Sequence, residues 1–204
     1  MNVTGYILAG GLSSRMGRDK AFLKFGETTF LENAAAVLRP VCREVKAVFN
    51  ISQKGFAGHL PEGVSGVFDI YEGRGPLGGI HTAFSDCPTE IAAVLAVDLP
   101  FVTTAAMEKL CALIAEEKTA AAFVPLQTDG RIQPLAAVYR AKKCLPPAEE
   151  ILAKKEKASM RRFLETINAK FIKAGDLSKN ADLFLNVNEK SEYEKLISKD
   201  HGLV

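Results

Sequence analysis

The chain has 204 residues, with 26 Lys and Arg against 24 Asp and Glu, and a formal net charge of +2. This balance gives no electrostatic footprint for nucleic acid or a membrane, so we expect small-molecule partners. A hydrophobic share of 48% and a charged share of 25% exclude disordered and collagen-like classes. The longest apolar run, residues 91–97, is far shorter than the roughly 20 residues of a membrane-spanning helix. With no signal segment evident, we expect a cytoplasmic protein.

Cysteine and histidine usage argues against several common kinds of site. The four cysteines are scattered without a C-x-x-C pair, and the three histidines form no H-E-x-x-H motif. Zinc and haem sites need clusters with such spacings, so neither is expected. No serine lies in G-x-S-x-G, which leaves a nucleophilic hydrolase without support. We expect reduced thiols that are mostly buried.

Apolar runs in the first half predict strands buried on both faces of a sheet, since such strands read as continuous Val, Ile, Leu and Ala. The predicted strands are residues 4–9, 45–49, 64–68 and 91–97. Helical patterns lie between or after them at residues 29–38, 76–87 and 103–117. This β-α-β alternation predicts a three-layer, Rossmann-like α/β fold, with a mostly parallel twisted sheet and helices on both faces.

The predicted strands share one property, because each ends in a glycine or a polar residue. These residues are Gly10, Asn50, Asp69 and Asp98. In open α/β sheets the ligand crevice lies beyond the carboxyl ends of the strands. We therefore expect all four residues to lie around one binding region.

The second half of the chain is less regular. Strand patterns at residues 121–126 and 132–140 flank a turn-forming Thr-Asp-Gly, and they predict an antiparallel edge of the sheet. Two helical patterns and a short strand follow, at residues 147–155, 159–166 and 170–174. Between residues 142 and 173 basic residues outnumber acidic ones nine to four, which fits either a solvated helix surface or an anion site.

The sharpest local signal follows the first predicted strand, in the sequence LAGGLSSRMGRDK at residues 8–20. Glycines let backbone N–H groups approach phosphate oxygens, and Arg15 and Lys20 add positive charge where a transferred phosphoryl group gains negative charge. The spacing matches neither the P-loop nor the dinucleotide fingerprint. The segment indicates a polyphosphate-binding loop, and a plain β-α connection with exposed cations is the alternative.

Two carboxylates follow predicted strands at the same edge. Asp98 could ligate Mg²⁺ beside substrate phosphates, or it could instead cap a turn before Pro100. Asp69 precedes the Gly-Pro-Leu-Gly-Gly sequence at residues 75–79, whose glycines would let the backbone approach a flat base. A simple turn is the alternative interpretation of Asp69.

Five segments carry a resemblance that runs nearly end to end. They are ILAGGLSSRMGRDKA (7–21), FDIYEGRGPLGGI (68–80), AVDLPF (96–101), QPLAAVY (133–139) and FLNVNEKSEYEKL (184–196). In this order the chain resembles the molybdenum cofactor guanylyltransferases, the MobA family of nucleotidyltransferases. The order makes the resemblance specific, since the first segment alone would indicate only a nucleotidyltransferase of this broad fold.

The resemblance implies a single nucleotidyltransferase domain over residues 1–204. It would transfer GMP from GTP to the terminal phosphate of molybdenum-molybdopterin, releasing pyrophosphate and forming molybdopterin guanine dinucleotide, with Mg²⁺ as cofactor. Residues 1–110 would mainly bind GTP and Mg²⁺, and residues 120–204 mainly molybdopterin. Transient contacts with cofactor-insertion proteins and molybdoenzymes are also implied.

The resemblance also assigns roles to matching positions. The implied GTP-binding residues are Leu8, Ala9, Gly10, Gly11, Lys20, Asn50, Asp69, Gly75, Pro76, Leu77 and Asp98. Asp98 would carry Mg²⁺, and Arg15, Lys20 and Asp98 would support catalysis. Asn186 and Asn188 would line the molybdopterin side. The Gly10-Gly11 pair favours guanine, because related cytidylyltransferases usually carry Ala-Gly there.

The chain departs from the family where Asn188 is followed by Glu189-Lys190 in place of the usual Thr-Pro. Ser191 and Glu194 fit a capping box that would start the next helix instead, and the asparagines could alternatively cap turns. Two other functions stay open. One is a nucleotidyltransferase that uses CTP or a sugar or polyol phosphate acceptor; the other is a non-catalytic module that binds GTP or pterin and delivers the cofactor.

Overall fold

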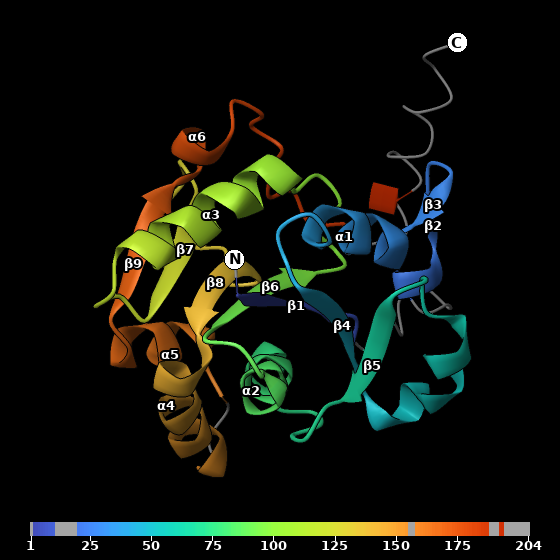
Figure 1. The fold of residues 1–204 in the computed structure, drawn as a ribbon, viewed down its shortest axis with the longest axis horizontal. Coiled ribbons are helices and arrows are strands. Elements are labelled where there is room, and N and C mark those ends of the chain that lie inside the picture. Colours follow the sequence, from blue (N-terminus) through green and yellow to red (C-terminus); the bar gives the residue numbers. More distant parts are fainter. Residues whose placement is uncertain (1, 11–19, 155–157, 188–191, 194–204) are drawn as a thin grey trace.

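The computed structural model describes residues 2–10, 20–154, 158–187 and 192–193. In this part of the chain a seven-stranded sheet lies between two layers of helices (Figure 1). The strands, in order across the sheet, are β5 (Val64–Phe68), β4 (Glu44–Phe49), β1 (Val3–Leu8), β6 (Ile91–Ala96), β8 (Ala136–Arg140), β7 (Ala122–Leu126) and β9 (Ala169–Lys173). The predicted three-layer α/β fold is confirmed.

Helices cover both faces of this sheet. They are α1 (Phe30–Leu38), α2 (Pro76–Asp86), α3 (Thr104–Glu116), α4 (Ala141–Ala153), α5 (Met160–Thr166) and α6 (Ala174–Leu177). Helices α1, α3 and α6 lie on one face, and α2, α4 and α5 lie on the other (Figure 1). Among the described helices, none combines the length and the apolar character needed to cross a bilayer.

Strand direction follows the predicted pattern. β1 pairs in parallel with β4 and β6, and β4 pairs in parallel with β5. β8 runs antiparallel to both of its neighbours, β6 and β7, and β9 then adds in parallel outside β7. Every residue of β1 and β6 is buried, which explains their continuous apolar sequences.

Two elements start more than one residue away from the predicted position, and proline is the reason in both cases. The predicted strand 132–140 begins at Ala136, because Pro134 has no N–H for the ladder and leaves Ile132 in an isolated bridge to Leu126. The predicted helix 147–155 begins at Ala141 and contains two prolines. A helix start at the second of these prolines was the expectation from sequence, since proline is favoured in a first turn.

Short elements without clear periodicity went unpredicted. They are the hairpin of β2 (Lys24–Phe25) and β3 (Thr28–Thr29), the 3-10 helices η1 (Lys20–Phe22) and η2 (Ile51–His59), and the short helix α6. The hairpin leads directly into α1, where Thr29 accepts a hydrogen bond from the Glu32 amide (3.1 Å) and donates its own amide to the Glu32 carboxylate (2.6 Å). This capping box fixes the start of the helix.

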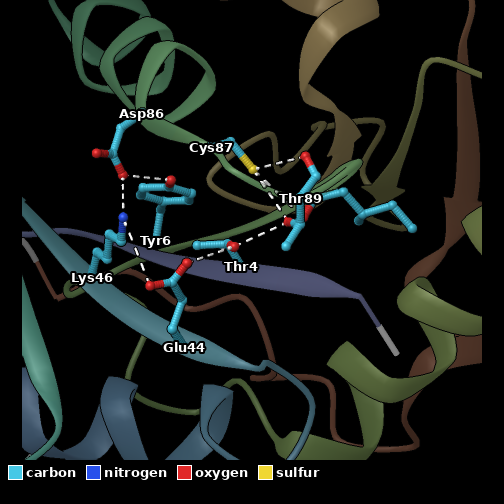
Figure 2. Close-up of polar contacts among 8 residues, drawn as sticks. Thr4, Tyr6, Glu44, Lys46, Asp86, Cys87 and Thr89 are labelled. Carbon is cyan, nitrogen blue, oxygen red and sulfur yellow. Dashed lines mark hydrogen bonds and ion pairs between the residues drawn. The ribbon is translucent and has the colours of Figure 1, made fainter.

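A polar network fastens the end of α2 to the amino-terminal half of the sheet (Figure 2). The Asp86 carboxylate accepts hydrogen bonds from the Tyr6 hydroxyl on β1 (2.7 Å) and from the Lys46 ammonium on β4 (2.8 Å). Burial, followed by the Asp86 contact, raises the pKa of Tyr6, so the phenol stays a donor. The other end of α2, at Pro76, therefore reaches the opposite edge of the sheet in a fixed position.

Helix α2 also packs against α4 through a buried histidine. His81 makes an edge-on ring contact with Tyr71 (centroids 4.8 Å apart), and its Nε2 lies 3.6 Å from the Glu149 carboxylate on α4. Burial lowers the pKa of His81, although Glu149 opposes this shift. The neutral imidazole is therefore the form that the fold favours.

The buried His81 predicts that the free energy of unfolding decreases in acid. Because the folded pKa of His81 lies below its unfolded value of about 6.5, the unfolded chain binds the extra proton and stability falls as pH drops below that value. We expect the melting temperature to fall less between pH 7.5 and 5.5 in His81→Gln than in the wild type. Thermal scans monitored by circular dichroism test this, with the exposed His59→Gln as control. Equal pH dependence in all three proteins would contradict the assignment.

Candidate active site

The predicted strand ends meet around a cavity of about 370 Å³ at the carboxyl edge of the sheet. It lies over the ends of β1, β4 and β5. Its lining residues are Leu8, Gly10, Val48, Phe49, Asn50, Ser52, Asp69, Glu72, Gly73, Gly75, Pro76 and Gly79. Three of the four residues expected there, Gly10, Asn50 and Asp69, line this cavity, whereas Asp98 does not.

The end of β1 forms one wall of this cavity, and main-chain hydrogen bonds hold it in place. The amides of Ala9 and Gly10 both donate to the Val48 carbonyl of β4 at 3.0 Å, and the Leu8 carbonyl accepts from the Val97 amide at 3.2 Å. A side chain at Gly10 would bring its Cβ to 3.0 Å from the Asn50 amide oxygen. A larger residue at this position would therefore push the Asn50 side chain aside.

Gln53 is a residue of this site that the sequence reasoning missed. Its side chain is buried, accepts a hydrogen bond from the Asn50 amide (2.8 Å) and donates one to the Ala9 carbonyl (3.3 Å). It therefore ties the residue before the glycine-rich loop to the residue after β4. The signal was present, because Asn50-x-x-Gln53 fits a capping box for the helix η2 that follows.

Asp69 lines the cavity and also holds a turn, as the simple-turn interpretation predicts. One carboxylate oxygen accepts from the Tyr71 amide (2.9 Å) and from the Thr82 hydroxyl of α2 (3.0 Å). The first turn of α2 passes very close to this turn, since a Cβ on Gly78 would lie 2.6 Å from the Tyr71 carbonyl oxygen. Gly75, just before the helix, has φ of 69°, a conformation that glycine adopts without strain.

Asp98 and Lys20 form a second polar centre beside the cavity. The Lys20 ammonium lies 4.0 Å from one oxygen of the Asp98 carboxylate. The other oxygen is buried, with no hydrogen-bond partner among the described residues. Burial raises the pKa of Asp98 and lowers the pKa of Lys20, and at this distance their mutual attraction offsets only part of either shift. A further positive charge at the free oxygen would favour the ionised carboxylate.

A larger cavity, of about 900 Å³, lies over the other half of the same edge. Aromatic and aliphatic side chains line it together with amides and arginines: Gln127, Arg131, Gln133, Arg161, Leu164, Phe171, Phe184, Leu185 and Asn186 are among them. The Gln133 amide donates to the Asn186 side chain (3.4 Å), and the neighbouring Val187 amide donates to the Asp98 carbonyl (3.0 Å). The segment that carries Asn186 is thereby fixed beside Asp98.

The two cavities and the charged pair follow one another along the sheet. The smaller cavity lies over β5, β4 and β1, Asp98 follows β6, and the larger cavity lies over β8, β7 and β9. A flat group with polar substituents fits the larger cavity, because its lining combines aromatic faces with guanidinium and carboxylate groups. The arrangement can bring two substrates together at one carboxylate.

The predicted site residues divide into three groups. Leu8, Gly10, Asn50, Asp69, Gly75 and Pro76 line the smaller cavity, and Asn186 lines the larger one. Ala9 and Leu77 are buried in the core and line neither cavity, while Lys20 and Asp98 form the pair between them. Gly11, Arg15, Asn188 and the capping box of Ser191 and Glu194 lie outside the described residues.

Comparison with known proteins decides the family. A family model described as the MobA-like NTP transferase domain matches residues 5–171, most of the chain. The chain belongs to this family. A MobA-like relative from Bacillus cytotoxicus, described as a probable molybdenum cofactor guanylyltransferase, is 31% identical over 97% of this chain and 97% of its own length. One from Carboxydothermus hydrogenoformans, with the same description, is 34% identical over 96% and 95%.

Solved structures agree with the MobA-like assignment at the level of the fold. Molybdopterin-guanine dinucleotide biosynthesis protein A from Archaeoglobus fulgidus superposes with a TM-score of 0.81 at 20% identity, covering 98% of this chain and all of that one (100%). Rv0371c from Mycobacterium tuberculosis, solved in complex with manganese, gives a TM-score of 0.67 at 16% identity, with coverage of 97% and 98%. The resemblance inferred from the five sequence segments is confirmed.

Neighbouring glycines of α2 provide a matched test of the cavity wall. In Gly78→Ala the new methyl group meets the Tyr71 carbonyl at 2.6 Å, so the turn must move, and we expect a loss of about 1–3 kcal/mol in the free energy of unfolding. In Gly79→Ala the nearest contact, with Leu8, is an ordinary 3.5 Å, and helix propensity offsets any cost. Urea denaturation compares the two. Equal stabilities would contradict the close approach.

Proposed function

We propose that this MobA-like protein transfers GMP from GTP to the terminal phosphate of molybdopterin and releases pyrophosphate. The observation that carries the proposal is the Lys20–Asp98 pair between two cavities at one sheet edge. Two further facts support it: the family match, and the description of its full-length relatives as guanylyltransferases.

The smaller cavity suits the nucleotide and the larger one the pterin. Asn50 and the backbone around Gly10 and Gly75 would contact GTP, with its phosphates directed towards Lys20. Asn186 and Gln133 would contact the pterin from the larger cavity. Residues 1–110 would then carry most of the GTP and metal contacts, and residues 120–204 most of the molybdopterin contacts.

The Asp98 carboxylate fits a divalent cation, for which we propose Mg²⁺. Its buried oxygen without a described partner is available as a hard ligand. Among the described residues no cluster of three or more acidic, histidine or cysteine side chains could hold a metal alone, so substrate phosphates would complete the shell, as is usual for Mg²⁺. The manganese complex of the structural neighbour Rv0371c is consistent with a divalent ion. A bound cation offsets the negative charge of the phosphates during transfer.

The chain itself contributes positioning and charge. A terminal phosphate oxygen of molybdopterin attacks the α-phosphorus of GTP, and the bond from that phosphorus to the bridging oxygen of pyrophosphate breaks. The nucleophile is already an anion, so no general base is required. Lys20 would stabilise the charge that develops on the α-phosphate and on the leaving group. The product would pass to cofactor-insertion proteins and molybdoenzymes through transient contacts.

Asp98→Asn tests the central carboxylate. It keeps the size of the side chain but loses the charge, and loss of such an electrostatic group typically lowers the rate by about 10²–10³. We expect at least that loss in turnover, together with weaker Mn²⁺ binding in the presence of GTP. The exposed Asp176→Asn on α6 is the control and should keep both properties. Near-normal turnover of folded Asp98→Asn would refute this role.

Nucleotide competition tests the reaction. The purified protein is incubated with molybdopterin, Mg²⁺ and equal amounts of GTP and CTP, and the pterin product is identified by mass. We expect molybdopterin guanine dinucleotide and an equal amount of pyrophosphate. A cytosine product would overturn the assignment of the base, and the absence of any dinucleotide would overturn the acceptor.

A further inference from the structure

Arg74 lies in the loop that joins β5 to α2, within the stretch that borders the nucleotide cavity. Glu72, Gly73, Gly75 and Pro76 all line that cavity, whereas Arg74 does not. Its side chain is directed elsewhere, towards α4. Arg74 therefore has no place in the contacts described so far for either substrate.

The guanidinium of Arg74 caps the carboxyl end of α4. Its Nη2 donates to the Leu152 carbonyl at 2.9 Å and also to the Lys154 carbonyl. Leu152 lies in the last turn of the helix, where carbonyl groups have no partner within the helix and the helix dipole favours a positive charge. The same nitrogen serves both oxygens, one through each of its two N–H groups.

A main-chain hydrogen bond from the Arg74 amide to the Tyr71 carbonyl (3.2 Å) closes the loop, but its two glycines are loosely packed. Gly73 and Gly75 flank Arg74 with φ of 73° and 69°, and a Cβ added at either would meet nothing within 4 Å. Glu72 is exposed, although its carboxylate accepts a hydrogen bond from the Ile51 amide. Unlike the core strands, this stretch is not fixed by packing, so its polar anchors decide where it lies.

Helix α4, whose last carbonyls accept the hydrogen bonds from Arg74, belongs to the second half of the chain. α4 packs on α2 and contacts α5, and α5 supplies Arg161 and Leu164 to the larger cavity. The hydrogen bond from Arg74 to Leu152 therefore attaches the loop to a helix that is distant in sequence and lies outside the β5–α2 unit. The arrangement joins the wall of one cavity to the helix layer that borders the other.

We propose that Arg74 is a positioning residue for nucleotide binding, which holds the Glu72–Pro76 loop in its binding conformation by anchoring it to the end of α4. This inference rests on the proposed function, because it takes the smaller cavity as the nucleotide site. Arg74 acts through the loop and touches neither the nucleotide nor the reacting atoms. Its loss therefore weakens nucleotide affinity and leaves the chemical step at saturating nucleotide intact.

The test measures GTP binding directly, by calorimetry with Mg²⁺ and no acceptor. We expect Kd to rise about tenfold in Arg74→Gln and by less in Arg74→Lys, which keeps a positive charge at the end of α4. The matched control is Arg39→Gln, since Arg39 also donates to a main-chain carbonyl, that of Glu62, but lies away from both cavities. In turnover assays the KM for GTP should rise by the same factor, with kcat within about twofold of the wild type.

The possible results separate this inference from the proposed function. If the wild type binds GTP and both Arg74 variants bind it equally well, the positioning role is overturned while the proposed function stands. A fall in kcat at unchanged Kd would also overturn it. If the wild type binds no GTP, both fail together. If Arg74→Gln does not fold, Arg74→Lys and its Kd decide the question in the same way.

Discussion

The shared direction of β5, β4, β1 and β6 is the constraint on which the rest of the structure depends. Parallel strands place all their carboxyl ends at one edge, so the residue that follows each strand is delivered there whatever its distance along the chain. Gly10, Asn50, Asp69 and the loop to Asp98 arrive together for this reason alone. Hydrogen bonds then sharpen the arrangement, with the Val48 carbonyl holding the amides of Ala9 and Gly10.

The reversal of β8 explains why the second cavity differs from the first. An antiparallel strand brings its beginning to this edge, so the residues before β8, including Gln133, lie where the neighbouring strands end. The segment after β9 also contributes Phe184, Leu185 and Asn186 to the wall of the larger cavity. The hydrogen bond from the Val187 amide to the Asp98 carbonyl holds this segment in place. β8 is the one reversed strand of the described sheet, and Asp98, which follows β6, lies next to it.

The elements that could be predicted from the sequence are those with a clear local periodicity. The buried strands and the residues after them could be predicted because a continuous apolar run marks a strand covered on both faces. The contact of Gln53 with Ala9 and that of Arg74 with Leu152 could not be assigned from sequence, since these partners are distant in the chain and known only from the fold. The predicted start of α4 was wrong. Its two prolines, taken alone, predict that a helix begins there, whereas in the structure they lie inside a helix that begins earlier, at Ala141.

The electrostatics of the Lys20–Asp98 pair give the proposed function its clearest physical basis. Burial shifts the pKa of each group in the direction that favours its neutral form, and a bound cation would satisfy the Asp98 oxygen that has no partner among the described residues. A crystal structure with GTP and Mn²⁺, read by the anomalous signal of manganese, tests this most directly. The account predicts a manganese peak at the Asp98 carboxylate and the nucleoside in the cavity beside Gly10 and Asn50. A manganese peak away from Asp98, or the nucleoside in the larger cavity, would contradict it.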